Sequence, residues 1–257
     1  RTRWDWAITI GSWIPAILWG VAFANLIRGV ELTPDYEMVS SFWSLLTPFA
    51  LLGGIVTALV FLTHGAIFLA LKTDGEMRER AATLAARLSI PAVAAAGVWG
   101  IWAQVAYSAH VLTWVPLLIA ALSLVATVFL TARRAEGWAF FSTSVAIAMV
   151  VVFIFGTLFP NVMPALNPEN SLTIAAASST PYTLKIMTWV AVGLMPFVLG
   201  YQAWTYWVFR KRLKRADFEA EILLGLEHGA EVEPASLVGR LLELGPDSVV
   251  LTLGGDG

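Results

Sequence analysis

The chain has no cysteine and few charged side chains, and both shortages narrow the classes of protein to which it can belong. With 0 Cys among 257 residues, disulfides, thiolate zinc sites and thiol nucleophiles are excluded. Charged residues make up 13% of the chain, about half of the roughly 25% that is usual in a soluble domain. The 16 Lys and Arg against 18 Asp and Glu leave no basic surplus to attract nucleic acid, so we expect no nucleic-acid partner.

Hydrophobic side chains take the place of the missing charge and make up 58% of the chain. A helix needs about 20 mostly apolar residues to cross a bilayer. Six segments meet this length, at about 6–27, 43–71, 86–107, 113–130, 138–159 and 182–209, and a charged amphipathic stretch at 76–87 precedes the third. Their hydrophobicity is continuous rather than alternating, which favours helices over a β-barrel. The predicted fold class is all-α, a polytopic bundle of six transmembrane helices in a lipid bilayer.

Lys and Arg occur in alternate connections between these segments, and this alternation predicts the orientation in the membrane. The basic positions fall at Arg1 and Arg3, within 72–87, at Arg133 and Arg134, and within 210–215. The connections between them, at 28–41, 106–112 and 160–181, carry one Lys or Arg at most. We therefore expect both ends of the six-helix block to lie in the cytoplasm.

The net charge of −2 is the sum of two unlike parts. Residues 1–213 carry 13 basic and 9 acidic side chains, a net +4, whereas residues 214–257 carry 3 and 9, a net −6. This contrast predicts a membrane domain at 1–213 and an acidic cytoplasmic tail at 214–257. The origin of the tail stays open between a real domain and a fusion, a read-through or a frame error.

Ionisable groups inside the apolar segments are functional candidates, because burying them in hydrocarbon is costly. His64 lies in the second segment, whereas His110 lies in a connecting loop and His228 in the tail. A haem or metal ligand would need a second buried partner, which the spans do not provide. We therefore favour a neutral His64 that is hydrogen-bonded within the bundle, and a role in proton passage stays open.

Two tryptophans in the third segment are the other candidates for binding a cofactor. Trp99 and Trp102 lie one helical turn apart, where they could line the edge of a cofactor, although a packing role is favoured. The sequence contains no phosphate-binding glycine loop, metal-ligand cluster or catalytic-triad spacing. The residues therefore predict no catalytic or metal-ligating side chain, and the cofactor-binding candidates are His64, Trp99 and Trp102.

A series of short motifs occurs in order along residues 1–212. The motifs are Arg3-Trp4-Asp5-Trp6, Ile10-Gly11-Ser12, Gly20-Val21-Ala22-Phe23-Ala24-Asn25-Leu26, Thr47-Pro48-Phe49, Leu52-Gly53-Gly54, Ala96-Gly97-Val98-Trp99, Trp138-Ala139-Phe140, Phe159-Pro160-Asn161-Val162-Met163-Pro164, Asn170-Ser171-Leu172-Thr173, Ala177-Ser178-Ser179, Thr183-Leu184-Lys185-Ile186-Met187-Thr188-Trp189-Val190-Ala191 and Tyr201-Gln202-Ala203-Trp204. Together they closely resemble subunit II of the cytochrome bd-type quinol oxidases. That subunit has about nine membrane helices, so the chain resembles its last six, and residues from about 216 onward depart from the family pattern.

The resemblance implies a function as well as a fold. Such a complex oxidises quinol and reduces oxygen to water in the bacterial cytoplasmic membrane. Its two haems b and its haem d are ligated by subunit I, with which subunit II forms a heterodimer and which it stabilises. Subunit II ligates no haem and can hold a structural quinone. The alternative is a secondary transporter or channel half, which the near absence of ionisable residues at the middle of the spans disfavours.

Overall fold

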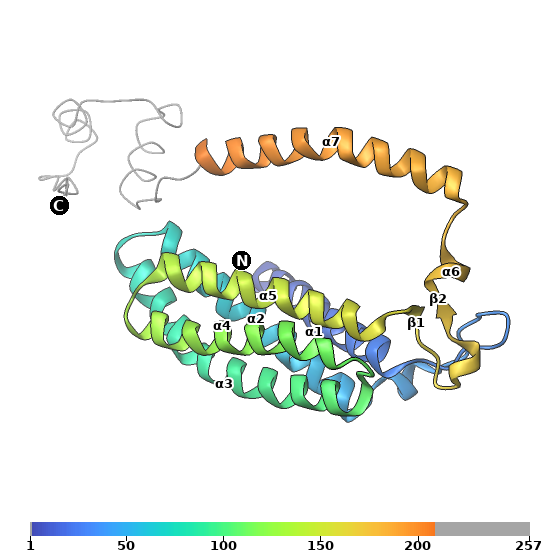
Figure 1. Cartoon of the computed structure of the whole chain (residues 1–257). Coiled ribbons are helices and arrows are strands. Elements are labelled where there is room, and N and C mark those ends of the chain that lie inside the picture. The colour runs from blue at the N-terminus through green and yellow to red at the C-terminus, as the bar shows by residue number, and fades with distance from the viewer. Residues whose placement is uncertain (1, 209–257) are drawn as a thin grey trace, which may run out of the picture.

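The protein is almost entirely helical in a computed structural model that describes residues 2–208. Five long helices form a bundle: α1 (Thr2–Arg28), α2 (Pro48–Lys72), α3 (Gly75–Tyr107), α4 (Trp114–Ala132) and α5 (Glu136–Leu158). A sixth, α7 (Pro181–Val208), lies apart from the bundle (Figure 1). Within the described residues, these 6 helices are long and apolar enough to cross a membrane. The predicted all-α fold with six spans is confirmed, whereas the predicted orientation and the domain boundary at 213/214 stay predictions, and the tail lies outside the described residues.

Short elements fill the connections at the end of the bundle where α1 ends and α2 begins. They are η1 (Phe42–Leu45), η2 (Val111–Thr113), β1 (Asn161–Met163), η3 (Pro168–Asn170), β2 (Leu172–Thr173) and α6 (Ile174–Ala177). The strands β1 and β2 pair antiparallel, and Asn170 Nδ2 donates to the carbonyl of Leu32 at 2.7 Å. These contacts join the loop after α1 to the loop before α7.

Two of the predicted helix starts are wrong, and local capping explains both. The second span begins at Pro48 rather than near residue 43, because the Thr47 side chain accepts a hydrogen bond from Ala50 N–H and caps the helix there. The third span begins at Gly75 rather than residue 86, with Asp74 as its N-cap. The charged stretch at 76–87 is therefore the first part of one helix of 33 residues. At about 1.5 Å per residue this helix is about 50 Å long, longer than the hydrocarbon core of about 30 Å.

Glycines allow α1, α2 and α3 to approach closely. A Cβ on Gly20 would lie 2.4 Å from the Gly53 carbonyl oxygen, and a Cβ on Gly54 would lie 3.0 Å from Ile17 Cγ2. Small residues at helix interfaces are typical of membrane bundles, where packing rather than water exclusion holds helices together. By contrast, a Cβ on Gly65 would meet nothing within 4 Å, so this glycine does not serve close approach.

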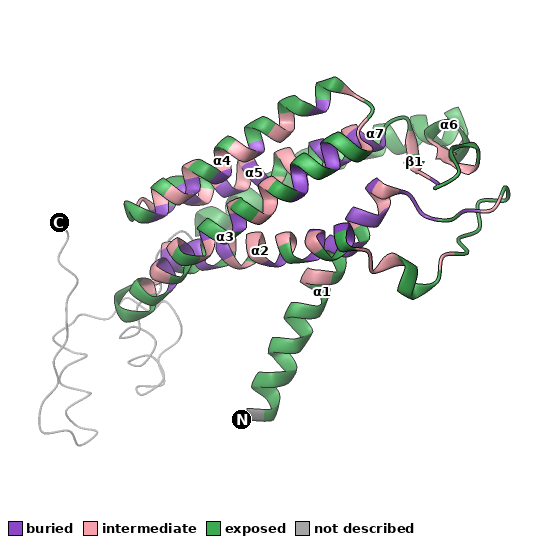
Figure 2. Ribbon diagram, turned by 90° about the horizontal axis from the view of Figure 1, so that it is seen from below, coloured by how far each residue is buried: buried purple, intermediate pink, exposed green. Residues whose placement is uncertain are grey.

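The buried core does not extend over every helix. Residues 3–15 of α1 are all exposed, as Figure 2 shows in green. In α7 no residue is buried, and apolar side chains such as Trp189 and Phe197 are 69% and 77% exposed. In a membrane such surfaces contact lipid or another protein.

Candidate functional site

His64 is held inside the bundle by a threonine from another helix. Its Nδ1 lies 2.7 Å from Thr143 Oγ1 of α5, and its ring stacks on Phe140 with centroids 4.7 Å apart. The Thr143 hydroxyl can donate to the carbonyl of Phe140 at 2.9 Å, which leaves its oxygen free to accept from Nδ1–H. The contact therefore joins α2 to α5 through His64, and the neutral state of the ring stays a prediction. Its part in cofactor binding or proton passage stays a prediction.

Trp99 belongs to an aromatic cluster at the core of the bundle. It is 6% exposed and stacks on Phe49 at 5.6 Å with an interplanar angle of 10°. Phe49 also contacts Tyr107 and Trp102, at 4.8 Å and 5.5 Å between centroids. The cluster joins α2 to α3 just inside the end of the bundle where α3 finishes.

Trp102 differs from Trp99 in its surroundings, although both contact Phe49. It is 40% exposed, so it faces partly away from the bundle. The structure therefore brings the two predicted tryptophans to one aromatic cluster but buries only the first. His64 lies 15 residues beyond Phe49 in α2, about 22 Å along the axis. The three candidate residues consequently do not form one site, and their part in cofactor binding stays a prediction.

An apolar cavity of about 660 Å³ opens among the five helices of the bundle. Its wall includes Phe23 and Trp19 of α1, Val60 and Phe61 of α2, Gly97, Trp99 and Ile101 of α3, Trp114, Leu118, Leu124 and Val125 of α4, and Ala146, Val151, Phe153 and Ile154 of α5. Volumes of this size are typical of small-molecule sites. Neither the sequence motifs nor the charge pattern indicated this cavity, because each helix contributes only a few apolar residues to it.

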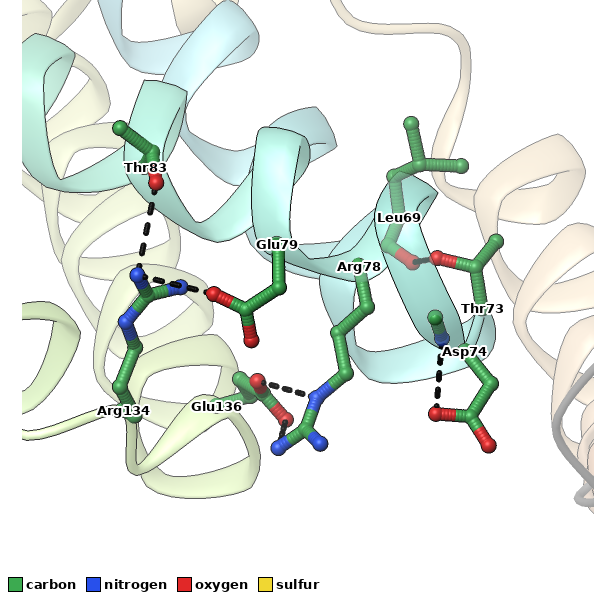
Figure 3. A network of polar contacts seen from close by, with 9 residues as sticks. Leu69, Thr73, Asp74, Arg78, Glu79, Thr83, Arg134 and Glu136 are labelled. Carbon is green, nitrogen blue, oxygen red and sulfur yellow. Dashed lines mark hydrogen bonds and ion pairs between the residues drawn. The ribbon is translucent and has the colours of Figure 1, made fainter.

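At the end of the bundle opposite the aromatic cluster, charged side chains join the hairpin of α2 and α3 to the hairpin of α4 and α5 (Figure 3). Arg78 of α3 donates from Nε to Glu136 Oε1 at 2.8 Å and from Nη2 to Glu136 Oε2 at 3.2 Å. Arg134, in the turn between α4 and α5, pairs with Glu79 at 3.2 Å and donates to Thr83 at 3.4 Å. These contacts hold the turn between α4 and α5 against the first three turns of α3.

Glu136 was missed by the sequence reasoning, which began the fifth span at residue 138. Its side chain is only 8% exposed, compared with 34% for Arg78. A single acid beside the Arg133-Arg134 pair was the available signal. Buried carboxylates are usually paired, but the sequence showed neither the burial of Glu136 nor its partner Arg78 on another helix.

At the other end of the bundle, hydrogen bonds link the connection between α3 and α4 to α3 and to the end of α5. Thr113 Oγ1 donates to Gln104 Oε1 at 2.8 Å, and His110 Nε2 lies 2.8 Å from the carbonyl oxygen of Phe159.

Among residues 2–208, no group of three or more His, Cys, Asp or Glu side chains is placed to hold a metal ion.

The arrangement defines a multi-pass helical membrane protein whose polar contacts join helices to one another. The chain belongs to the family described as cytochrome bd terminal oxidase subunit II, which matches residues 1–209. It is 36% identical over 222 residues to "Cytochrome bd ubiquinol oxidase subunit 2" of Bacillus subtilis, covering 83% of this chain and 65% of that protein. It is 35% identical over 259 residues to "Cytochrome bd-I ubiquinol oxidase subunit 2" of Escherichia coli K12, covering 85% of this chain and 68% of that protein.

A relative from a third organism agrees with these two. "Probable cytochrome oxidase subunit 2" of Haemophilus influenzae is 33% identical over 245 residues, which cover 80% of this chain and 64% of that protein. The chain thus spans about two thirds of the length of the relatives. The suspected family is confirmed, and the comparisons do not favour a transporter or channel.

Proposed function

We propose that the chain is an accessory membrane subunit of a bacterial cytochrome bd-type terminal oxidase. In this proposal the complex oxidises quinol and reduces oxygen to water in the cytoplasmic membrane. The family match over residues 1–209 is the observation that carries the proposal. The six membrane helices support it, since they place this chain in the same medium as the quinol.

The two histidines among the described residues are not placed to ligate one haem together. His64 lies within α2, with its Nδ1 2.7 Å from Thr143 Oγ1, and His110 lies at the Tyr107 end of the bundle, with its Nε2 2.8 Å from the carbonyl oxygen of Phe159. A haem with two axial ligands needs both side chains on opposite faces of one ring, and these two histidines lie too far apart along the bundle to provide that. In keeping with the family resemblance, we propose that the two haems b and the haem d are bound by subunit I.

The family resemblance also implied a structural quinone. The cavity wall offers few hydrogen-bond donors for the carbonyl groups of a quinone ring. The Thr57 hydroxyl in the wall donates to the Gly53 carbonyl at 2.9 Å. The Trp99 indole Nε1 has no partner among the described residues, but it lies beside α2, 3.0 Å from where a Cβ of Gly53 would be. Buried quinone carbonyls without hydrogen bonds would be costly, so we place no quinone ring in this cavity.

The exposed apolar surfaces of α1 and α7 suit a subunit that packs against a larger partner. Trp4 is 75% exposed and Phe197 is 77% exposed, and both belong to helices long enough to span the bilayer. We propose that part of this surface contacts subunit I in a heterodimer and that the remainder contacts lipid. The role of the chain is then to stabilise the haem-bearing subunit rather than to carry a reaction centre.

Co-expression with subunit I tests this proposal. We expect a purified complex that contains both chains and shows the absorption band of haem d, because subunit I needs the additional helical surface to retain its haems. Subunit I expressed alone is the control and should lose much of this band and of its quinol oxidase turnover. Full haem content and full turnover of subunit I without this chain would contradict the proposal.

A further inference from the structure

The cavity has a buried floor and an exposed rim. Phe153 is 0% exposed and Ala146 is 1% exposed, whereas Phe61, Ile101 and Val151 are 49%, 56% and 46% exposed. The rim side chains belong to spans whose outer surfaces face the hydrocarbon. The mouth of the cavity is therefore continuous with the surface that contacts lipid.

We propose that this cavity takes one acyl chain of a membrane phospholipid. The wall contains no charged side chain, and its threonine hydroxyl is already bonded to a carbonyl. The Trp99 indole N–H has no partner among the described residues but lies against α2. An occupant therefore gains mainly from apolar contact, and its polar head has to remain outside. A phospholipid has this division of chemistry, since its chains are apolar and its head stays at the membrane surface.

The dimensions of the cavity agree with a single chain. On α4 the wall extends from Trp114 to Val125, about 17 Å at 1.5 Å per residue. Half of a hydrocarbon core of about 30 Å is about 15 Å, the depth that the acyl chain of one leaflet covers.

Trp114 marks the end of the cavity at which the head group would lie. It is the first residue of α4, lines the cavity and is 37% exposed. Tryptophan favours the membrane interface, where its ring is apolar and its N–H reaches polar groups. The lipid therefore belongs to the leaflet at the Trp114 end, with its chain running toward Val125.

Gly97 offers a way to fill the cavity without disturbing the helices. It lines the cavity, and a Cβ built on it meets nothing within 4 Å. Gly97→Leu should place a side chain where the acyl chain would lie. Gly65→Leu is the matched control, because Gly65 also has no neighbour within 4 Å of its Cβ and does not line the cavity.

The experiment measures the phospholipid that each variant retains. Full chains, in the assembly in which they are extracted from the membrane, are washed in detergent and analysed by native mass spectrometry and by lipid extraction. We expect one retained phospholipid in the wild type and in Gly65→Leu, and about tenfold weaker retention in Gly97→Leu, equivalent to about 1.4 kcal/mol. Ala121→Leu, which fills the cavity from the α4 side, repeats the test if Gly97→Leu fails to fold.

Three results would overturn the proposal. One is a wild type that retains no phospholipid, and another is equal retention in the wild type and the filled variants. The third is a prenylated quinone in place of the phospholipid, lost on filling. None of these measurements depends on oxidase activity, so a failure here is distinguishable from a failure of the proposed function.

Discussion

Glu136 and Arg78 form a bidentate ion pair between α5 and α3, with N–O distances of 2.8 Å and 3.2 Å (Figure 3). The Glu136 carboxylate is nearly buried, so this ion pair should stabilise the fold more than an exposed ion pair would. Together with the Arg134–Glu79 contact, it fixes how the α4–α5 hairpin sits against the α2–α3 hairpin.

Arg78→Ala should lower the free energy of unfolding by about 1–3 kcal/mol, because it leaves the Glu136 carboxylate nearly buried without its guanidinium. This range is below that of a fully buried pair, since Arg78 is itself 34% exposed. Arg80→Ala is the control: its pair with Glu76 is exposed and should contribute 1 kcal/mol or less, as is typical of surface pairs. Equal changes in thermal midpoint (Tm) in detergent would show that the buried pair does not join the hairpins.

Gly20→Ala should destabilise the bundle by about 1–3 kcal/mol, the usual cost of overpacking. Its new methyl group would meet the Gly53 carbonyl, which is backbone and cannot rotate away. Gly65→Ala, in open space on α2, should instead gain up to about 1 kcal/mol from helix propensity. The two variants should therefore move Tm in opposite directions. A Tm for Gly20→Ala at or above the wild-type value would mean that the helices do not meet at this point.

Trp99→Ala should cost about 3–5 kcal/mol, because it removes a buried ring that stacks on Phe49 and contacts Phe153. It should also lower haem retention in the partner subunit by loosening the bundle. Trp102→Ala, at a ring that is 40% exposed, should cost less than half as much. Thermal unfolding and the haem absorption of the assembled complex measure both effects. A lost haem band in Trp102→Ala with unchanged Tm would instead support a cofactor contact at Trp102.

His64→Leu should leave the haem spectrum of the complex unchanged and lower stability by about 0.5–1.5 kcal/mol, the usual contribution of one hydrogen bond. The reason is that His64 bonds to Thr143 and stacks on Phe140. His64→Gln, which keeps a group able to bond to Thr143, should recover part of the stability. Disappearance of a haem band in His64→Leu would make this histidine a ligand and overturn the structural interpretation.

Much of the architecture was predictable from local patterns. Runs of about 20 apolar residues identify spans regardless of what they pack against, because the bilayer imposes the length. Errors occurred at starts such as Thr47–Pro48 and Asp74–Gly75, where a capping side chain rather than hydrophobicity determines the first turn.

The candidate site was less predictable. His64, Trp99 and Trp102 were singled out as unusual residues in apolar surroundings, and the structure separates His64 from the two tryptophans. Their partners Thr143, Phe140 and Phe49 come from other positions along the chain, and no spacing in the sequence relates them.

The membrane environment, the six spans and the family can be predicted from the linear chain, because apolar length and the order of motifs do not depend on how the helices pack. The pairing of Glu136 with Arg78, the close approach of Gly20 to Gly53 and the apolar cavity among five helices emerge only when the helices pack. These relationships depend on the rotation and separation of helices far apart in sequence, which packing sets and hydrophobic pattern leaves open.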